Sequence, residues 1–168
     1  MLKERIHRDL FEAIKMNNEL TRSVLRMLNA AILNREKEKR FKIAKTEPEL
    51  SEEKLTGKSQ LADEEIIEVI FSEIKKRAEA ALGFEKGKRL ESAEKEKKEA
   101  GILRRYLPEL ASEEEIRTLA KAAILKSEAR EIKDMGKVMA ELMPRLKGKA
   151  DNALISKVVK ELLSAPNL

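Results

Sequence analysis

The chain has 168 residues, of which 40% are charged, and its 36 Lys and Arg against 31 Asp and Glu give a formal net charge of +5. It contains no Cys and a single His, which excludes a disulfide-stapled domain, a thiolate metal site, a Cys nucleophile and a multi-His metal centre. With 42% hydrophobic residues, the chain has enough apolar content to form a folded core.

The distribution of charge predicts a cytoplasmic protein with no membrane segment. The longest run without a charged side chain is residues 27–34, whereas about 20 apolar residues are needed to cross a bilayer. The first five residues mix both signs of charge and lead into no apolar run, so no secretory signal is expected.

Almost every segment carries apolar residues at helical spacing and none alternates as a strand would, so we predict an all-α protein. Residues 1–110 are expected to form an N-terminal helical domain of about four helices. The first helix starts at Leu2 and is ended by Asn17 and Asn18; the others run over about residues 21–40, 63–82 and 88–106. The charged end of the second helix, residues 35–40, is expected to project into solvent.

Residues 41–61 show no clear periodicity. Pro48 and Gly57 lie there among Ser, Thr and Glu residues, a composition typical of loops. This segment is therefore predicted to be a connector within the N-terminal domain.

Pro108 is expected to end the fourth helix, and residues 111–168 are predicted to form a compact C-terminal domain of three helices. Ser112 and Glu115 have the spacing of a capping box, which starts the fifth helix. The sixth helix is predicted over about residues 132–146. A tight turn at residues 147–149 follows, and Asp151 caps the last helix.

No catalytic residue, metal site or cofactor is predicted. Glu4 and His7 have the Glu-x-x-His spacing of di-iron helix bundles, but the second His that such a site needs is missing from the chain. Carboxylates such as those in residues 94–99 alternate with Lys, which is typical of solvated helix faces rather than of an acid–base pair. No phosphate-binding loop or nucleophile elbow occurs.

The strongest candidate for an anion site is the turn before the last helix. Arg145, Lys147 and Lys149 surround Gly148 there, so basic side chains, backbone amides and the helix dipole would converge on a bound phosphate. Asp151 partly opposes this site. Ordinary surface bases remain the alternative.

Two further features leave alternatives open. Arg22 and Arg26 lie one turn apart on the second helix and form a weaker basic cluster. Met135, Met139 and Met143 are spaced by four residues, which fits either core packing or an adaptable partner surface. The five aromatic residues mostly fall on apolar helix faces, so RNA would be bound through its phosphates and shape rather than by base stacking.

Several sequence phrases resemble those of the GatB/YqeY family, and most closely the stand-alone YqeY-like proteins. The most specific are KDMGKVM at residues 133–139 and LMPRLKGKAD at residues 142–151. LRMLNAAI at residues 25–32, IKKR at 74–77 and YLPE at 106–109 agree in order and spacing. The resemblance implies an N-terminal helical domain and a small three-helix tail domain.

The resemblance also suggests a function. Related domains form the C-terminal tail of the B subunit of the glutamine-dependent tRNA amidotransferase, a carbon–nitrogen ligase; that tail contacts tRNA while the chemistry lies in other domains and subunits. We therefore expect a non-catalytic, tRNA-associated accessory protein. Its contacts would come from Lys137, Arg145, Lys147 and Lys149, with Arg22 and Arg26 secondary.

Two alternatives involve protein partners. The chain could be a helical protein-interaction module that uses the Met face of the sixth helix or the polar end of the second. It could also be an amidotransferase component that acts only together with partner subunits.

Overall fold

The computed structural model describes residues 1–146 and 148–164, and these residues contain helices and no strand, which confirms the all-α prediction. The helices are α1 (Leu2–Lys15), α2 (Glu19–Thr46), α3 (Glu52–Ser59), α4 (Asp63–Lys86), α5 (Leu90–Arg104), α6 (Glu113–Lys126), the 3-10 helix η1 (Ile132–Asp134), α7 (Met135–Leu146) and α8 (Asn152–Ser164). They form two compact units, Met1–Tyr106 and Leu107–Leu168.

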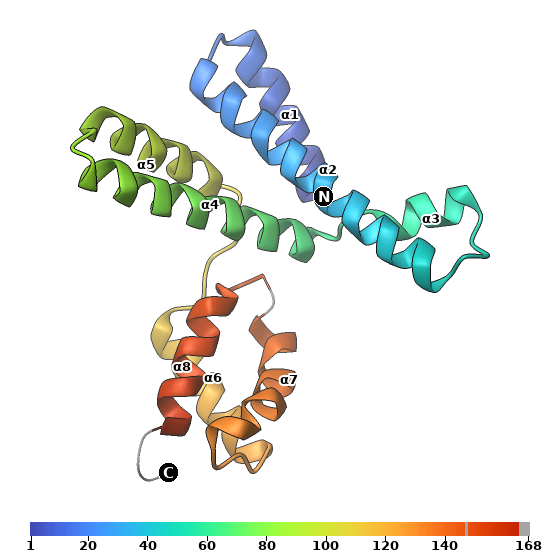
Figure 1. Cartoon of the computed structure of the whole chain (residues 1–168), viewed down its shortest axis with the longest axis vertical. Coiled ribbons are helices and arrows are strands. Elements are labelled where there is room, and N and C mark those ends of the chain that lie inside the picture. Colours follow the sequence, from blue (N-terminus) through green and yellow to red (C-terminus); the bar gives the residue numbers. More distant parts are fainter. Residues whose placement is uncertain (147, 165–168) are drawn as a thin grey trace. The chain divides into compact units, whose positions relative to one another are not determined.

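In the first unit, α1 pairs with α2 and α4 pairs with α5, and the two pairs cross where α2 meets α4 (Figure 1). Apolar side chains from these four helices fill the crossing. Fully buried members of this core are Ile6, Val24, Leu25, Leu28, Ile32, Ile66, Ile70 and Leu103.

The chain breaks between α1 and α2 at Asn17 and Asn18, as predicted. Asn17 has a φ of 52°, in the left-handed region that Asn tolerates better than most residues. The side-chain oxygen of Asn18 accepts a hydrogen bond of 3.0 Å from the backbone N–H of Thr21, so Asn18 caps α2.

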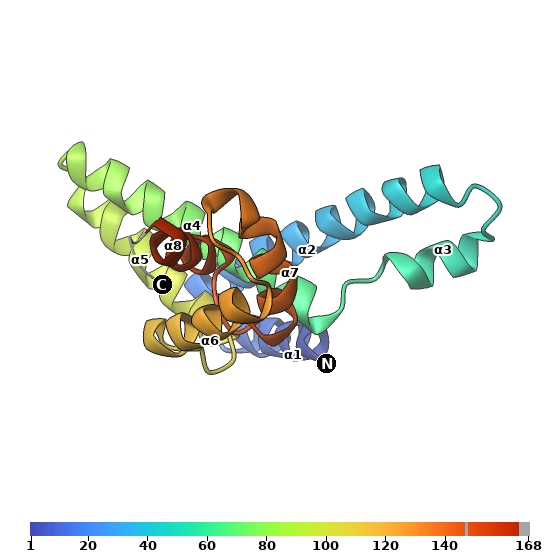
Figure 2. The same cartoon turned by 90° about the horizontal axis from the view of Figure 1, so that it is seen from below.

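The segment 41–61 is more ordered than its composition suggested, because α2 continues to Thr46 and α3 follows it. α3 lies beside the C-terminal end of α2 (Figure 2). Arg40 of α2 donates a hydrogen bond of 2.8 Å to the hydroxyl of Thr56, and Leu55 is buried against the same end. The prediction of an aperiodic connector is therefore wrong for most of this segment.

The charged end of α2 does not simply project into solvent. Its Lys and Glu side chains are long enough to reach neighbouring helices: Lys39 pairs with Glu65 of α4 at 2.7 Å, and Glu36 pairs with Lys3 of α1 at 2.6 Å. Both pairs are mostly shielded from solvent. This end of α2 is thus part of the unit's surface network.

A buried charge cluster holds α4 to α5. The guanidinium of Arg77, which is only 4% exposed, contacts the carboxylate of Glu73 at 2.9 Å and that of Glu99 on α5 at 3.2 Å. It also donates to the sulfur of Met27 on α2 at 3.8 Å. Burial by itself raises the pKa of Glu73, but hydrogen bonds from Lys76 and Arg77 outweigh it and hold that pKa below its ordinary value.

This cluster corrects the expectation for residues 94–99. Glu99 faces Arg77 rather than water and is 7% exposed. The physical reason is that a buried guanidinium needs compensating carboxylates, and Glu99 is the acid of α5 that lies within reach.

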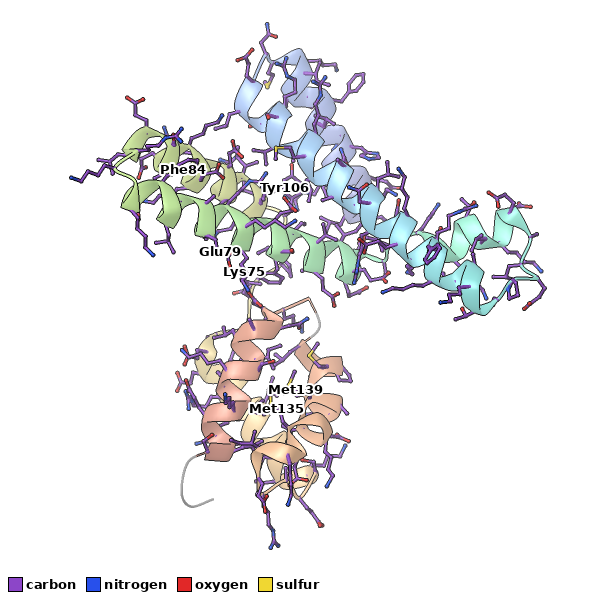
Figure 3. The ribbon with its side chains drawn as sticks, viewed as in Figure 1. Lys75, Glu79, Phe84, Tyr106, Met135 and Met139 are labelled. Atoms are coloured by element: carbon purple, nitrogen blue, oxygen red, sulfur yellow. The ribbon has the colours of Figure 1, made fainter. Side chains whose placement is uncertain are left out.

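The first unit ends at Tyr106, whose hydroxyl donates a hydrogen bond of 2.9 Å to Asp9 on α1 (Figure 3). The guanidinium of Arg5 lies over the Tyr106 ring, 5.1 Å from its centre, and donates to the backbone oxygen of Arg105. Burial and the hydrogen bond to Asp9 raise the pKa of Tyr106. These contacts tie the end of α5 to α1.

The second unit is built from α6, η1, α7 and α8 around its own apolar core. The capping box is present as predicted, because Ser112 N–H donates to Glu115 at 2.8 Å and Glu115 N–H donates to the Ser112 hydroxyl at 3.2 Å. The largest buried side chains of this core are Ile116, Leu142, Leu146 and Ile155.

The buried cluster in the first unit gives a stability prediction. Replacing Arg77 with Met removes the partner of the buried Glu99 and leaves the buried Glu73 with Lys76 alone, so Arg77→Met is expected to lower the unfolding free energy by about 3 kcal/mol. Lys76→Met, which removes the 67% exposed partner of Glu73, is the matched control and is expected to cost less than about 1 kcal/mol. Urea unfolding followed by circular dichroism measures both, and equal losses would contradict the role assigned to burial.

Candidate functional site

The turn between α7 and α8 is fixed by backbone hydrogen bonds. Gly148 has a φ of 76°, a left-handed conformation that glycine adopts without steric cost. Lys149 N–H donates to the oxygen of Leu146 at 2.9 Å, and Ala111 N–H donates to the oxygen of Lys149 at 2.8 Å. The segment just before α6 therefore holds the turn in place, while Lys147 lies outside the described residues.

The N-terminus of α8 is capped by Asp151, as the sequence indicated. The carboxylate of Asp151 accepts a hydrogen bond of 2.7 Å from Ala153 N–H. It thus places a negative charge at the positive end of the helix dipole. An external anion would have to compete with this carboxylate, so the exposed bases and not the helix terminus are the groups available to bind phosphate.

Arg145 and Lys149 line one groove of about 900 Å³ beside the start of α6. Both side chains are exposed, and neither forms an ion pair with any residue that the structure describes. The other lining residues are Pro108, Glu109, Leu110, Ala111, Ser112, Glu114, Glu115, Thr118, Leu119 and Leu146. The structure therefore brings two of the predicted bases together at one edge of a hollow.

The lining of this groove also contains acids. Glu109, Glu114 and Glu115 all line it, so its three acids outnumber its two described bases. Hydrogen bonds from the backbone and hydroxyl of Ser112 lower the pKa of Glu115, and the positive charge of Lys149 adds to the effect. The sequence did not reveal these acids as neighbours of the turn, because they come from the preceding segment and from α6.

Arg145 also lines a second, smaller hollow of about 170 Å³ between α6 and α7. Lys126 and Glu141 close this hollow as an ion pair of 2.5 Å between the two helices. Its apolar wall is formed by Leu119, Ala122 and Ala123. Arg145 therefore lines two hollows and forms no ion pair among the described residues.

Lys137 lies eight residues before Arg145 on α7, which corresponds to about 12 Å along the helix axis. Its side chain is 68% exposed, but its ammonium group contacts Asp134 at 2.9 Å. Asp134 also accepts backbone hydrogen bonds from Arg130 and Glu131. The hydrogen bond from Lys137, followed by those of the backbone, lowers the pKa of Asp134 to about 2.

The secondary bases belong to the other compact unit. Arg22 on α2 lies 3.5 Å from Glu19, and Arg26, one turn later, is exposed and forms no ion pair within the described residues. Asn29 lies one turn after Arg26 and has a buried side-chain oxygen without a hydrogen-bond partner. The structure thus joins Arg145 with Lys149 in one unit and leaves Arg22 and Arg26 as a separate cluster.

The three Met residues of α7 pack against the core of the second unit. Met135, Met139 and Met143 are partly buried and contact the cluster formed by α6, α7 and α8; Figure 3 labels the first two. Their spacing thus serves mainly the packing of α7.

Within the described residues, no helix is both long and apolar enough to cross a membrane. The same part of the chain contains no group of three His, Cys, Asp or Glu side chains placed to hold a metal ion.

The Asp134 network predicts a specific acid response. A carboxyl with a lowered pKa stabilises the folded state above its unfolded pKa of 3.8 and loses that contribution as the pH falls toward about 2. Asp134→Asn is therefore expected to reduce the loss of stability between pH 4 and pH 2, measured as the urea midpoint at each pH. Glu128→Gln, at an exposed acid without a described ion pair, is the control, and an unchanged acid response in Asp134→Asn would contradict the assignment.

Two comparisons with known proteins indicate the family of the chain. Residues 3–163 match the family of Yqey-like proteins. The chain is also 27% identical over 164 residues to the protein named "Altered inheritance of mitochondria protein 41, mitochondrial" from Pyrenophora tritici-repentis (strain Pt-1C-BFP), and the match covers 96% of this chain and 80% of that protein. Because the family match spans nearly all of its length, the chain belongs to the family of Yqey-like proteins.

Proposed function

We propose that this protein is a non-catalytic accessory protein that binds tRNA through its second unit. The proposed contacts are Arg145, Lys147 and Lys149 at the turn before α8, with Lys137 about two turns earlier on α7. Support comes from the resemblance of residues 133–151 to the tRNA-contacting tail of the amidotransferase B subunit. The same resemblance supports a non-catalytic role, because the ligase chemistry of that enzyme lies in other domains and subunits.

The observation that carries the proposal is that two exposed bases of one groove, Arg145 and Lys149, form no ion pair among the described residues. In the second unit, ion pairs are formed by five bases, which are Arg117, Lys126, Lys133, Lys137 and Lys157, whereas Lys121, Arg130 and Lys160 form none among the described residues. Arg145 and Lys149 are exposed and have none among the described residues. Exposed bases of this kind gain the most from displacing the counterions of a phosphate backbone.

The composition of the second unit favours phosphate contacts over base stacking. Residues 107–168 contain no Phe, Tyr, Trp or His. Stacking platforms for unpaired bases require such side chains or an Arg plane. A folded RNA held by its backbone is therefore the better fit.

The proposed compartment is the cytoplasm. The name of the fungal relative places that protein in mitochondria. Both compartments contain tRNA, so the proposed activity is compatible with either.

The test is filter binding of tRNA to the full-length protein over a range of salt concentrations. We expect binding at low salt that weakens steeply as salt rises, because phosphate contacts release counterions. The double variant Arg145→Gln with Lys149→Gln is expected to reduce the slope of log affinity against log salt by about 1 to 2.

Lys160→Gln is the control, because Lys160 is an exposed base on α8 that has no described ion pair and lies outside the groove. It is expected to leave the affinity within about twofold, since it removes no proposed contact. Absence of tRNA retention at low salt would refute the proposal. An equal loss in Lys160→Gln would show that binding is spread over the whole surface.

A further inference from the structure

The most exposed aromatic side chain among the described residues is Phe41, in the C-terminal half of α2, which is 71% exposed. It departs from the expectation that the aromatic residues mostly lie on apolar helix faces. α2 lies beside α3 in this region (Figure 2), and Arg40 joins the two helices by donating to Thr56. Successive residues of an α-helix are rotated by about 100°, so the Phe41 ring lies on a different side of α2 from this contact.

Three lysines surround Phe41 on the surface of α2. Lys37 lies four residues before Phe41 and Lys45 lies four residues after it, so the three side chains share one face of the helix. Lys42 is the next residue after the ring. All three lysines are exposed, and none of them forms an ion pair among the described residues. We call Lys37, Phe41, Lys42 and Lys45 the α2 patch.

The acids near the α2 patch in the sequence are already neutralised. Glu36 pairs with Lys3 at 2.6 Å, Glu38 pairs with Arg35 at 3.0 Å, and Glu47 pairs with Lys58 at 2.5 Å. No other acid occurs in residues 36–47. The α2 patch therefore carries three positive charges without a paired acid, which favours an anionic partner.

The arrangement of apolar and charged groups distinguishes between two anionic partners. The exposed apolar residues of this face, Phe41 and the 50% exposed Leu33, are separated by Lys37. A helix that lies in a membrane interface instead keeps a wide apolar face apart from its bases. Proteins that bind single-stranded nucleic acid combine bases that follow the backbone with aromatic rings on which nucleobases stack. The α2 patch has this second arrangement.

We propose that the α2 patch binds single-stranded RNA, with an unpaired base stacked on Phe41 and neighbouring phosphates held by Lys37, Lys42 and Lys45. The outer two lysines are eight residues apart, which is about 12 Å along the helix. Because every base has a face that can stack, little sequence preference is expected. This site is independent of the tRNA contacts proposed at the turn before α8, where the second unit offers no aromatic ring.

Fluorescence anisotropy of a labelled, unstructured RNA of about ten nucleotides with the full-length protein at low salt tests this proposal. Phe41→Ala is expected to weaken binding at least about fivefold, because it removes the stacking platform. Phe41→Tyr keeps a ring and is expected to retain the affinity. Phe11→Ala is the matched control, at a 65% exposed Phe on α1 whose neighbour Lys15 is paired with Glu12 at 3.3 Å. It is expected to stay within about twofold of the wild type.

The lysines are tested through the salt dependence of the same binding. The double variant Lys37→Gln with Lys45→Gln is expected to lower the slope of log affinity against log salt by about 1.4, since each phosphate contact on a single strand contributes about 0.7. Annealing the complementary strand to the probe is expected to weaken binding, because paired bases are not available to stack on Phe41.

A tryptophan reporter tests the stacking contact itself. The chain contains no Trp, so Phe41→Trp carries a single one, and its fluorescence is expected to be quenched by the RNA. Phe11→Trp is expected to remain unquenched. Adding Arg145→Gln and Lys149→Gln to Phe41→Trp is expected to leave the quenching unchanged, which separates this site from the proposed tRNA contacts.

Several results would overturn the proposal. They are no binding of the RNA by the wild-type chain at low salt, equal losses in Phe41→Ala and Phe11→Ala, and no quenching in Phe41→Trp. Loss of the quenching on removal of Arg145 and Lys149 would also do so. A blue shift of the Phe41→Trp emission with vesicles of anionic lipid, without quenching by RNA, would identify a membrane surface as the partner instead.

Discussion

The buried guanidinium of Arg77 is the constraint on which the architecture of the first unit depends. A guanidinium cannot be deprotonated inside a protein, so its burial requires compensating charge. Glu73 supplies that charge from α4 and Glu99 supplies it from α5, while Met27 of α2 contacts the same group. One side chain thus contacts three helices.

The second unit is organised differently, by local caps around an aliphatic core. The Ser112 capping box starts α6 and Asp151 caps α8, while Gly148 turns the chain between α7 and α8. The described residues of this unit contain no buried charged side chain. Its bases lie on the surface, where they can contact phosphates.

Local signals in the sequence predicted the local features well. Ser112 and Asp151 cap the helices that they were expected to cap, because a cap depends on residues only two or three positions apart. The sequence did not predict α3, because Gly57 lies within it and Pro48 shortly before it. Ser51 nevertheless caps this helix, and Arg40 of α2 donates a hydrogen bond to its Thr56. The features that the sequence did not predict depend on contacts between segments far apart in the chain.

Nonlocal contacts explain what sequence patterns could not predict at the candidate sites. The burial of Glu99 depends on Arg77, which is 22 residues away. The acids beside the turn before α8 belong to the segment before α6 and to α6 itself. Arg145 and Lys149 could be identified as neighbours from the sequence because they are only four residues apart. The acids of their groove could be identified only from the tertiary structure.

The central claim is that the turn before α8 is the surface that holds tRNA. Its most direct test is a titration of the isotope-labelled full-length protein with tRNA at low salt, followed by amide chemical shifts. We predict that the amides of Ala111, Gly148, Lys149 and their neighbours shift first, because they lie at the Arg145 and Lys149 edge of the groove. Unchanged shifts at this turn, with or without changes on α2, would contradict the account.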